Sequence, residues 1–361
     1  MLKIILGIVV ALLAYLLLWP VPIDPQAWQA PAVKGYVGNF AVNDKLENFQ
    51  RIEVAGLHGP EAAVASANGD LYATTHEGWI VRWVNGSGNA EKWVNLGGRP
   101  LGLAFDAQGN LWVANAYLGL QKISPQKLVT TEVTEVAGVA VRYADDLDIA
   151  PNGKILFSDA STKFAAEDWQ STLGASLLDL MEHGLHGRII EYDPATKQSK
   201  VVMDQLSFAN GVAIDPAGEF ALIAETGAYR VWKYWLSGSK EGQSEVLIDN
   251  LPGFPDNVHN GQDGRYWVGL TSPRSKALDD LSEKPFVRKI VQRLPASMRP
   301  KVENYGMVLA IDANGKVLAN LQAPSGKVYA TTGVAETDNS IYVTSLTAPF
   351  LAKYSKAELG L

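Results

Sequence analysis

The sequence predicts an all-β protein, a six-bladed β-propeller, with an N-terminal transmembrane helix and two helical insertions that act as lids. Three observations support this prediction. A hairpin-turn pattern recurs six times along the chain, most intervals between its occurrences approach the length of a propeller blade, and an apolar run precedes the first repeat.

Composition narrows the class of protein before any motif is considered. The chain has 361 residues, 47% of them apolar and 19% charged, which is typical of a folded globular protein. Its net charge of −7 gives no electrostatic basis for nucleic-acid binding. The absence of cysteine excludes disulfides, thiolate metal sites and cysteine nucleophiles.

Residues 1–23 are predicted to be a membrane anchor. Ile4–Trp19 is an unbroken run of apolar and small residues that follows Lys3. A helix of this length rises about 24 Å, slightly less than a ~30 Å hydrocarbon core, and Pro20 ends it. Positive charge before the helix predicts that the rest of the chain lies outside, in the periplasm or on another extracytoplasmic or lumenal side. A cleaved signal peptide, and hence a secreted protein, is the alternative; no small-x-small cleavage site before Pro20 supports it.

After a proline-containing spacer at 24–40, residues 41–361 are predicted to form the propeller. Six short turns, each preceding alternating apolar residues, are typical of hairpins between two strands. The turns centre on Gly69, Gly109, Gly153, Gly218, Gly264 and Asn339. The intervals are 40, 44, 65, 46 and 75 residues. A β-sandwich or two smaller β domains would not require six turns in one register.

The two long intervals contain insertions at about 163–185 and 274–303. Both carry apolar residues at helical spacing. In the first insertion these are Leu173, Leu177, Leu178, Leu180 and Met181. We expect both insertions to be lids over one face of the propeller.

Counting eight residues back from each turn identifies equivalent positions near the start of each blade's first strand. These are Glu61, Leu101, Asp145, Asn210, Asp256 and, with an uncertainty of one residue, Thr331 or Thr332. The first strand of a blade lines the central channel, so these positions form a ring around the axis near one mouth.

Three carboxylates and one carboxamide in one ring predict a metal site. Like charges this close raise each other's pKa, and a hard divalent cation removes that cost. Oxygen-only ligands suit Ca²⁺ or another hard divalent cation, whereas zinc would favour His or Cys. We therefore predict Glu61, Asp145, Asn210 and Asp256 as the metal ligands. Alternatively, such residues cap turns and strand ends, but four of six equivalent positions favour the metal.

Two neighbours of the ring and three histidines have less certain roles. Asp146 and Asn257 point to the opposite face of their strands. They are either outer-shell groups, a second ion site, or side chains that hold loops by hydrogen bonds. His58, His76 and His259 fall near predicted mouth loops, where they would assist catalysis or hold a loop.

The motifs around the ring resemble those of one known family. They are Gly98-Arg99-Pro100-Leu101-Gly102-Leu103, Tyr143-Ala144-Asp145-Asp146-Leu147, Phe208-Ala209-Asn210-Gly211-Val212-Ala213 and Leu251-Pro252-Gly253-Phe254-Pro255-Asp256-Asn257. From about residue 45 to its end, the chain resembles strictosidine synthase-like proteins, including those of the adipocyte plasma membrane-associated type. These belong to the gluconolactonase–paraoxonase superfamily of six-bladed propellers.

The resemblance implies roles for individual residues. In the calcium-dependent hydrolases of the superfamily, ligands match Glu61, Asn210 and Asp256, while Asp145 replaces an asparagine. The histidine of paraoxonase-type lactonases falls at Leu101. The glutamate of true strictosidine synthases falls at Thr331 or Thr332, which argues against strictosidine chemistry.

Three functions follow from these features. The first is a membrane-anchored, calcium-dependent hydrolase of apolar lactones or aryl and small esters, with Asp256 as nucleophile or general base. The second is a non-enzymatic, membrane-tethered binding module with a structural ion. The third, disfavoured by the absent glutamate, is a strictosidine synthase-type enzyme that forms carbon–nitrogen bonds.

Overall fold

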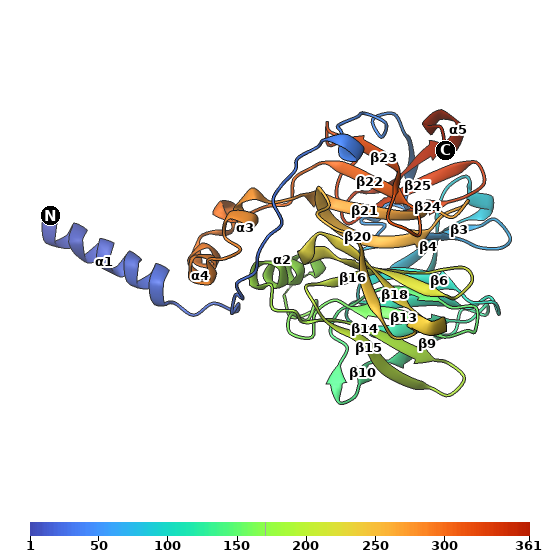
Figure 1. The fold of residues 1–361 in the computed structure, drawn as a ribbon, viewed down its shortest axis with the longest axis horizontal. Coiled ribbons are helices and arrows are strands. Elements are labelled where there is room, and N and C mark those ends of the chain that lie inside the picture. Colours follow the sequence, from blue (N-terminus) through green and yellow to red (C-terminus); the bar gives the residue numbers. More distant parts are fainter. Residues whose placement is uncertain (170) are drawn as a thin grey trace.

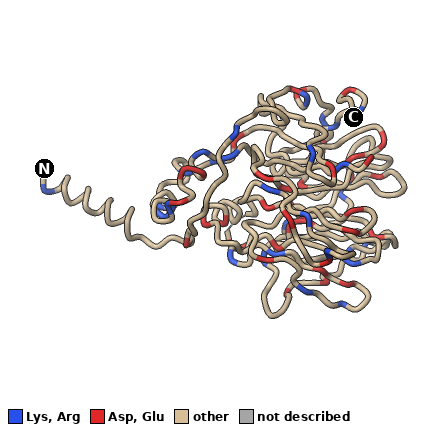
Figure 2. The backbone as a smooth tube through the Cα atoms, in the orientation of Figure 1, with Lys and Arg blue, Asp and Glu red and all other residues tan. Residues whose placement is uncertain are grey.

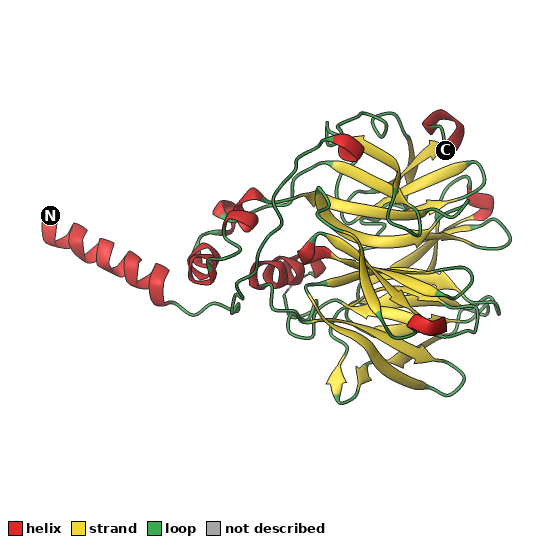
Figure 3. Ribbon diagram, viewed as in Figure 1, coloured by secondary structure: helices red, strands yellow, loops and turns green. Residues whose placement is uncertain are grey.

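Six four-stranded antiparallel sheets surround a central axis, which confirms the predicted all-β, six-bladed propeller (Figures 1 and 3). This computed structural model describes residues 1–169 and 171–361. The innermost strands of neighbouring blades contact one another around the axis. Their ends nearest the helical insertions form one mouth of the central channel.

Each of the first three blades contains four strands that follow one another along the chain. Blade one comprises β2 (Ala63–Ala65), β3 (Leu71–Thr74), β4 (Trp79–Trp83) and β5 (Glu91–Asn95). Blade two comprises β6 (Pro100–Phe105), β7 (Leu111–Asn115), β8 (Gly119–Ile123) and β9 (Val129–Val133). Blade three comprises β12 (Ala144–Ile149), β13 (Ile155–Asp159), β14 (Gly187–Asp193) and β15 (Gln198–Leu206). A small hairpin, β10 (Glu135–Val136) and β11 (Val139–Ala140), precedes blade three.

The last three blades continue this order, and the predicted turns separate the two inner strands of every blade. Blade four comprises β16 (Ala209–Ile214), β17 (Phe220–Glu225), β18 (Arg230–Trp235) and β19 (Ser244–Ile248). Blade five comprises β20 (Gly253–Asn260), β21 (Tyr266–Pro273), β22 (Gly306–Ile311) and β23 (Val317–Ala323). Blade six comprises β24 (Thr331–Glu336), β25 (Ser340–Ser345), β26 (Phe350–Ser355) and, as its outermost strand, β1 (Gln50–Glu53).

The ring is closed by pairing the first strand with the last. β1 pairs antiparallel with β26, from Gln50 opposite Lys353 to Glu53 opposite Phe350. Both ends of the propeller therefore belong to one sheet. The hydrophobic core fills the spaces between blades; Leu222 of blade four, for example, packs in one cluster with Val268 of blade five. Burial of such side chains contributes about 1.5–3 kcal/mol each.

The N-terminal helix is shorter than a membrane-spanning helix. α1 runs from Leu2 to Leu18, and none of its 17 residues is buried. It rises about 25 Å, less than the ~30 Å of a hydrocarbon core. Among the described residues, no helix has both the length and the apolar character needed to cross a membrane. The structure thus does not support the predicted transmembrane helix.

Both predicted insertions contain helices on the side of the propeller from which α1 projects (Figure 1). Lid one, residues 163–185, contains α2 (Thr172–Glu182), whose N-terminus is capped by the Ser171 hydroxyl; Gln170 lies outside the described residues. Lid two, residues 274–303, contains α3 (Lys276–Asp280), α4 (Pro285–Arg293) and η5 (Ala296–Met298). The remaining short helices are η1 (Gly38–Phe40), η2 (Val84–Gly86), η3 (Thr226–Ala228), η4 (Gly238–Lys240) and α5 (Lys356–Leu359).

The spacer at 24–40 packs against the lids. The Asp24 amide donates to the Glu182 carboxylate at 2.7 Å, and the Trp28 ring stacks on His183 with centroids 4.0 Å apart. His183 also forms a 3.0 Å hydrogen bond with Ser207 in the propeller. Burial lowers the pKa of His183 to about 3, so its ring is neutral at physiological pH.

Arg288 of α4 joins the two lids and the spacer. Its buried guanidinium donates to the Met181 carbonyl of lid one at 2.9 Å and to the Ser282 carbonyl of lid two at 3.1 Å. It also donates to the Gln26 carbonyl in the spacer. The three segments therefore form one structural unit over the mouth.

Replacing Arg288 with methionine is expected to destabilise this unit. Several buried carbonyls would lose their donor, at about 1–3 kcal/mol for each unpaired group. We expect the free energy of unfolding to fall by about 3 kcal/mol in urea denaturation, and limited proteolysis to cut the lids first. The control Lys289→Met removes a partly exposed ion pair with Asp24 and should cost less than about 1 kcal/mol. Equal losses in the two variants would contradict a special role for Arg288.

Candidate functional site

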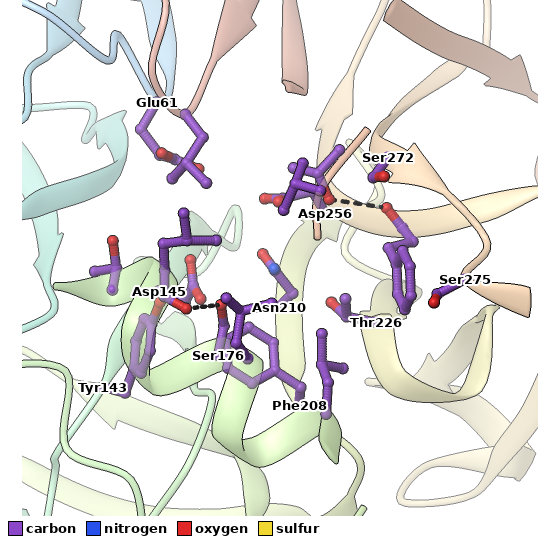
Figure 4. Close-up of a pocket in the computed structure, with 18 of the residues that line it drawn as sticks. Glu61, Tyr143, Asp145, Ser176, Phe208, Asn210, Thr226, Asp256, Ser272 and Ser275 are labelled. Carbon is purple, nitrogen blue, oxygen red and sulfur yellow. Dashed lines mark hydrogen bonds between the residues drawn. The ribbon is translucent and has the colours of Figure 1, made fainter. Parts of the chain in front are cut away.

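A pocket lies at the propeller axis beneath the two lids (Figure 4). We call it the axial pocket. Its carboxylates and its carboxamide come from the mouth ends of the inner strands. Its apolar walls come from the propeller and from both lids. The apolar wall residues are Leu101, Leu173, Leu177, Leu180, Phe208, Phe254, Leu278, Pro300, Val302 and Leu346.

All four predicted metal ligands line this pocket, as Figure 4 shows for their side chains. Glu61 lies just before β2, and the other three lie in β12, β16 and β20. The structure thus brings together Glu61, Asp145, Asn210 and Asp256, with Leu101 at the equivalent place in blade two.

Blade six contributes no acid or base at its equivalent position. The Thr331 hydroxyl donates to the Leu270 carbonyl at 2.8 Å, and the Thr332 hydroxyl donates to the Glu61 carbonyl at 2.6 Å. Both hydroxyls are therefore engaged with backbone, and Leu346 forms the pocket wall on this side.

Irregular strand pairing explains why the ring side chains point into the pocket. In blades three, four and five the register between the two inner strands shifts at Asp145, Asn210 and Asp256. Such an irregularity bends the strand and changes the direction of a side chain. Regular alternation resumes after each shift, so the rest of each inner strand packs normally.

Burial makes the charged forms of the ring carboxyls costly. It raises the pKa of Asp145 and of Asp256 well above the ordinary value, and Glu61 raises both further by charge repulsion. The pKa of Glu61 itself rises to about 7 because of burial, opposed by Arg99. The three groups cannot all be ionised near neutral pH without a compensating positive charge.

Arg99 supplies part of that charge. Its Nη2 donates to the Glu61 carboxylate at 2.9 Å, its Nη1 donates to the Gly59 carbonyl at 3.1 Å, and both charged side chains are buried. Three ionised carboxylates and one guanidinium leave a charge of −2 at the ring, which equals the charge that one divalent cation neutralises. No role for Arg99 was predicted from the sequence; its position two residues before Leu101 was the available signal.

The donor atoms suit a hard divalent cation. The side-chain oxygens Oδ1 of Asn210 and Oδ1 of Asp256 are buried and have no hydrogen-bond partner in the structure. Unpaired buried oxygens are costly, and a cation would satisfy them. Within the described chain, however, no three His, Cys, Asp or Glu side chains lie close enough together to hold a metal ion. An ion at this ring therefore requires the carboxylates to approach one another.

Asp146 and Asn257 lie beneath the pocket and link blades. The Asp146 carboxylate accepts from the Val212 amide of blade four at 3.0 Å. The Asn257 amide donates to the Glu61 carbonyl at 3.2 Å. Neither residue lines the pocket. In this structure they hold blades in register, and Asn257 also fixes the backbone of Glu61.

Polar residues at the ends of second strands position the loops that lead to the ring. The Asp159 carboxylate accepts from the Tyr143 amide at 2.8 Å and is itself held by Arg188 at 2.9 Å. Glu225 likewise accepts from the Ser207 amide at 2.8 Å. These contacts were not predicted from the sequence, although a polar residue ends the second strand in successive blades.

None of the five histidines lines the axial pocket. His58 lies at the surface, 2.8 Å from Glu77. His259 lies deeper in the channel, with its Nε2 4.0 Å from Asp146, and burial lowers its pKa to about 4. The predicted placement of His259 in a mouth loop is therefore wrong, because β20 carries it toward the opposite end of the channel.

Fold and site together define a six-bladed propeller with a buried acidic pocket at one end of its axis. Sequence comparison is consistent with this class: the profile of strictosidine synthase matches residues 145–239, and that of the strictosidine synthase-like N-terminal region matches residues 38–83. The chain belongs to the strictosidine synthase-like family that contains the adipocyte plasma membrane-associated proteins.

Two relatives illustrate the extent of the match. Adipocyte plasma membrane-associated protein of Rattus norvegicus is 32% identical over 372 residues, covering 97% of each chain. Protein strictosidine synthase-like 13 of Arabidopsis thaliana is 38% identical over 256 residues, covering 69% of this chain and 62% of the relative.

Solved structures share the fold at low sequence identity. A gluconolactonase from Xanthomonas campestris has a TM-score of 0.62 and 15% identity, covering 93% of this chain and 96% of its own. A calcium-binding regucalcin from Agrobacterium tumefaciens has a TM-score of 0.58 and 15% identity, covering 84% and 93%. Both likenesses establish the propeller architecture alone.

The stability of the metal-free protein is expected to fall as pH rises. The pKa of Glu61 is raised from 4.5 to about 7 in the folded state, so the folded state holds its proton more tightly than the unfolded state. This stabilisation is complete below about pH 4.5 and is lost as pH rises through about 7; a shift of this size corresponds to about 3 kcal/mol. Thermal unfolding in chelator between pH 5 and 8 measures it.

Two variants test whether the ring causes this pH dependence. Asp256→Asn removes one repelling charge and should flatten the profile. Asp263→Asn, at a side chain that is 85% exposed, should leave the profile unchanged. A wild-type melting temperature that is constant or rises across this range would show that the ring carboxyls do not share protons.

Proposed function

We propose that this protein is a hydrolase of lactones or of aryl and other small esters that depends on Ca²⁺ or another hard divalent cation. The observation that carries the proposal is the axial pocket, in which buried carboxylates and an amide lie beneath apolar walls. Buried ionisable groups with shifted pKa values in a concave site are the usual signature of catalytic function.

The residues that would hold the ion are Glu61, Asp145, Asn210 and Asp256. A bound divalent cation would supply Lewis-acid polarisation of the substrate carbonyl and neutralise the charge of the ring. The aspartate at position 145 adds a negative charge relative to an asparagine, so it should strengthen cation binding. Arg99 holds one Glu61 oxygen and thereby fixes the direction of that carboxylate.

Asp256 is the proposed catalytic residue. Its carboxylate is buried and faces the pocket, where it would accept a proton from an attacking water. Direct attack on the substrate carbonyl by the same carboxylate is the alternative route. In either route, the lids restrict access of bulk water to the pocket.

The pocket walls favour an apolar substrate. Leucine side chains from both lids face the same space as Phe208 and Phe254 of the propeller. The proposed substrate therefore combines one ester or lactone carbonyl with a largely apolar body.

A non-enzymatic, membrane-tethered binding module is the second candidate. It is favoured by the wide placement of the ring carboxylates, of which no three lie close enough to hold a metal. It is also favoured by Leu101, which cannot transfer a proton. The structure gives no support to carbon–nitrogen bond formation, because the Thr331 and Thr332 hydroxyls are engaged with backbone.

We also propose that the chain works at a membrane. Its relatives are named plasma membrane-associated proteins, and α1 exposes apolar side chains on every face. A helix that is apolar all round is stable in water only when something apolar covers it. The expected location of the propeller, on the outer side of that membrane, stays a prediction.

Calcium titration of the full-length protein by calorimetry should detect binding that depends on the ring. We expect wild type to bind Ca²⁺, and Asp256→Asn to weaken binding at least tenfold because one ligand charge is lost. Asp263→Asn, in an exposed turn on the opposite face, should bind as wild type does. No heat of binding at millimolar Ca²⁺ would contradict a metal site.

A panel of lactones and aryl esters should reveal hydrolysis that requires Asp256. We expect Asp256→Ala to lower kcat/KM by about 10²–10⁴, the usual contribution of a positioned base, while Asp263→Asn retains activity. Calcium binding without turnover on any member of the panel would favour the binding module. Full activity in Asp256→Ala would reject the catalytic role of this residue.

A further inference from the structure

Lid two has an unusual charge pattern in a chain whose net charge is −7. Between positions 284 and 302 there are six basic residues and no acidic one. The basic residues are Lys284, Arg288, Lys289, Arg293, Arg299 and Lys301. Figure 2 shows basic positions on this part of the chain, next to the end of α1.

Large apolar side chains lie on the outward face of lid two, where a helix on a water-soluble surface would carry polar ones. In α4 the side chains Arg288 and Arg293 are buried. Phe286 is 56% exposed, and Met298, just beyond α4, is 64% exposed. A surface that buries arginines and exposes large apolar side chains marks a site of interaction.

α4 also holds the end of α1. The Arg293 guanidinium donates to the Trp19 carbonyl at 2.6 Å and to the Leu16 carbonyl at 2.9 Å. In return, the Tyr15 hydroxyl donates to the Arg293 carbonyl at 3.0 Å. The apolar helix and the apolar face of lid two are therefore fixed relative to each other, on the same side of the propeller (Figure 1).

From these contacts we propose that lid two binds the surface of an anionic lipid bilayer, next to the place where α1 enters it. Phe286 and Met298 would enter the boundary between headgroups and acyl chains. The exposed Lys284 and Lys301 would contact anionic headgroups, which attract basic side chains near a charged surface. An apolar insertion combined with a basic patch is the combination that gives stable membrane binding.

A groove beside this face adjoins the axial pocket and shares wall residues with it. It has a volume of about 890 Å³, and its walls include Tyr15 and Trp19 at the α1 end. Leu173, Leu177 and Leu278 line both this groove and the axial pocket. If the proposed hydrolase function holds, its substrates are esters or lactones that dissolve in the bilayer and reach the pocket through the groove.

Site-specific fluorescence on the full chain tests the membrane contact separately from catalysis. Because the chain has no cysteine, Met298→Cys gives a unique position for an environment-sensitive dye. The control is Lys316→Cys, an exposed position in the turn between β22 and β23, which lies at the end of blade five away from the lids. We expect a blue shift at 298, and none at 316, when vesicles containing phosphatidylglycerol are added.

Charge reversal tests the specificity for anionic lipid. In the Met298→Cys background, Lys284→Glu with Lys301→Glu should reduce the blue shift and raise the lipid concentration for half-binding at least tenfold. Lys127→Glu with Lys316→Glu, a matched reversal at exposed turns on the far face, should change neither quantity. Equal blue shifts on neutral phosphatidylcholine vesicles would reject the role of the lysines.

An unshifted spectrum at position 298 would overturn the proposal, whether or not the protein sediments with the vesicles. Sedimentation without a shift would mean that α1 alone contacts lipid and that lid two faces a protein partner or a second copy. Since none of these measurements uses turnover, their failure would leave the hydrolase proposal to be decided by its own assays.

Discussion

Excess negative charge buried at the propeller axis is the constraint around which the rest of the site is arranged. Carboxylates removed from water must be paired, protonated or bound to a cation. Arg99 pairs with one of them, and Asp146 and Asn257, which directly follow the other two carboxylates, form hydrogen bonds to other blades. The close approach of the inner strands also depends on this region: a Cβ atom on Gly211 would lie 2.1 Å from the Val258 amide nitrogen. The buried carboxylates and the closest contacts between inner strands therefore lie in the same region of the axis.

The lids cover the polar ring of the axial pocket with apolar side chains, and they must stay attached to the propeller to do so. Their helices are short, and isolated helices of this length are unstable in water. The attachment comes instead from buried polar contacts, chiefly those of Arg288 and Glu182, and from the stacking of Trp28 on a neutral His183. The spacer at 24–40 is consequently part of the folded structure, although its proline content suggested a simple linker.

The sequence was informative where a pattern repeats and uninformative where contacts are long-range. Six turns in one register were sufficient to predict the blades, and counting back from them identified Glu61, Asp145, Asn210 and Asp256. The pairing of Arg99 with Glu61 joins residues 38 positions apart in different blades, and no local pattern encodes such a contact. The pairing of β1 with β26 was likewise missed, because strand partners depend on closure of the whole ring. At the N-terminus the hydropathy pattern predicted a helix of nearly the observed length, but not that this helix is too short to meet the requirements for crossing a membrane.

The closure of blade six has a consequence for the order of events during synthesis. β1 emerges from the ribosome early, but its only partner in the sheet, β26, is made about 300 residues later. Until then, the sixth sheet lacks its outer edge, and blades one and five have no sheet between them. The early strand must remain unpaired, with its hydrogen-bonding groups available to other chains. Its sequence is Gln50-Arg51-Ile52-Glu53, in which three of the four residues are polar. This composition keeps the unpaired strand soluble until β26 has been synthesised.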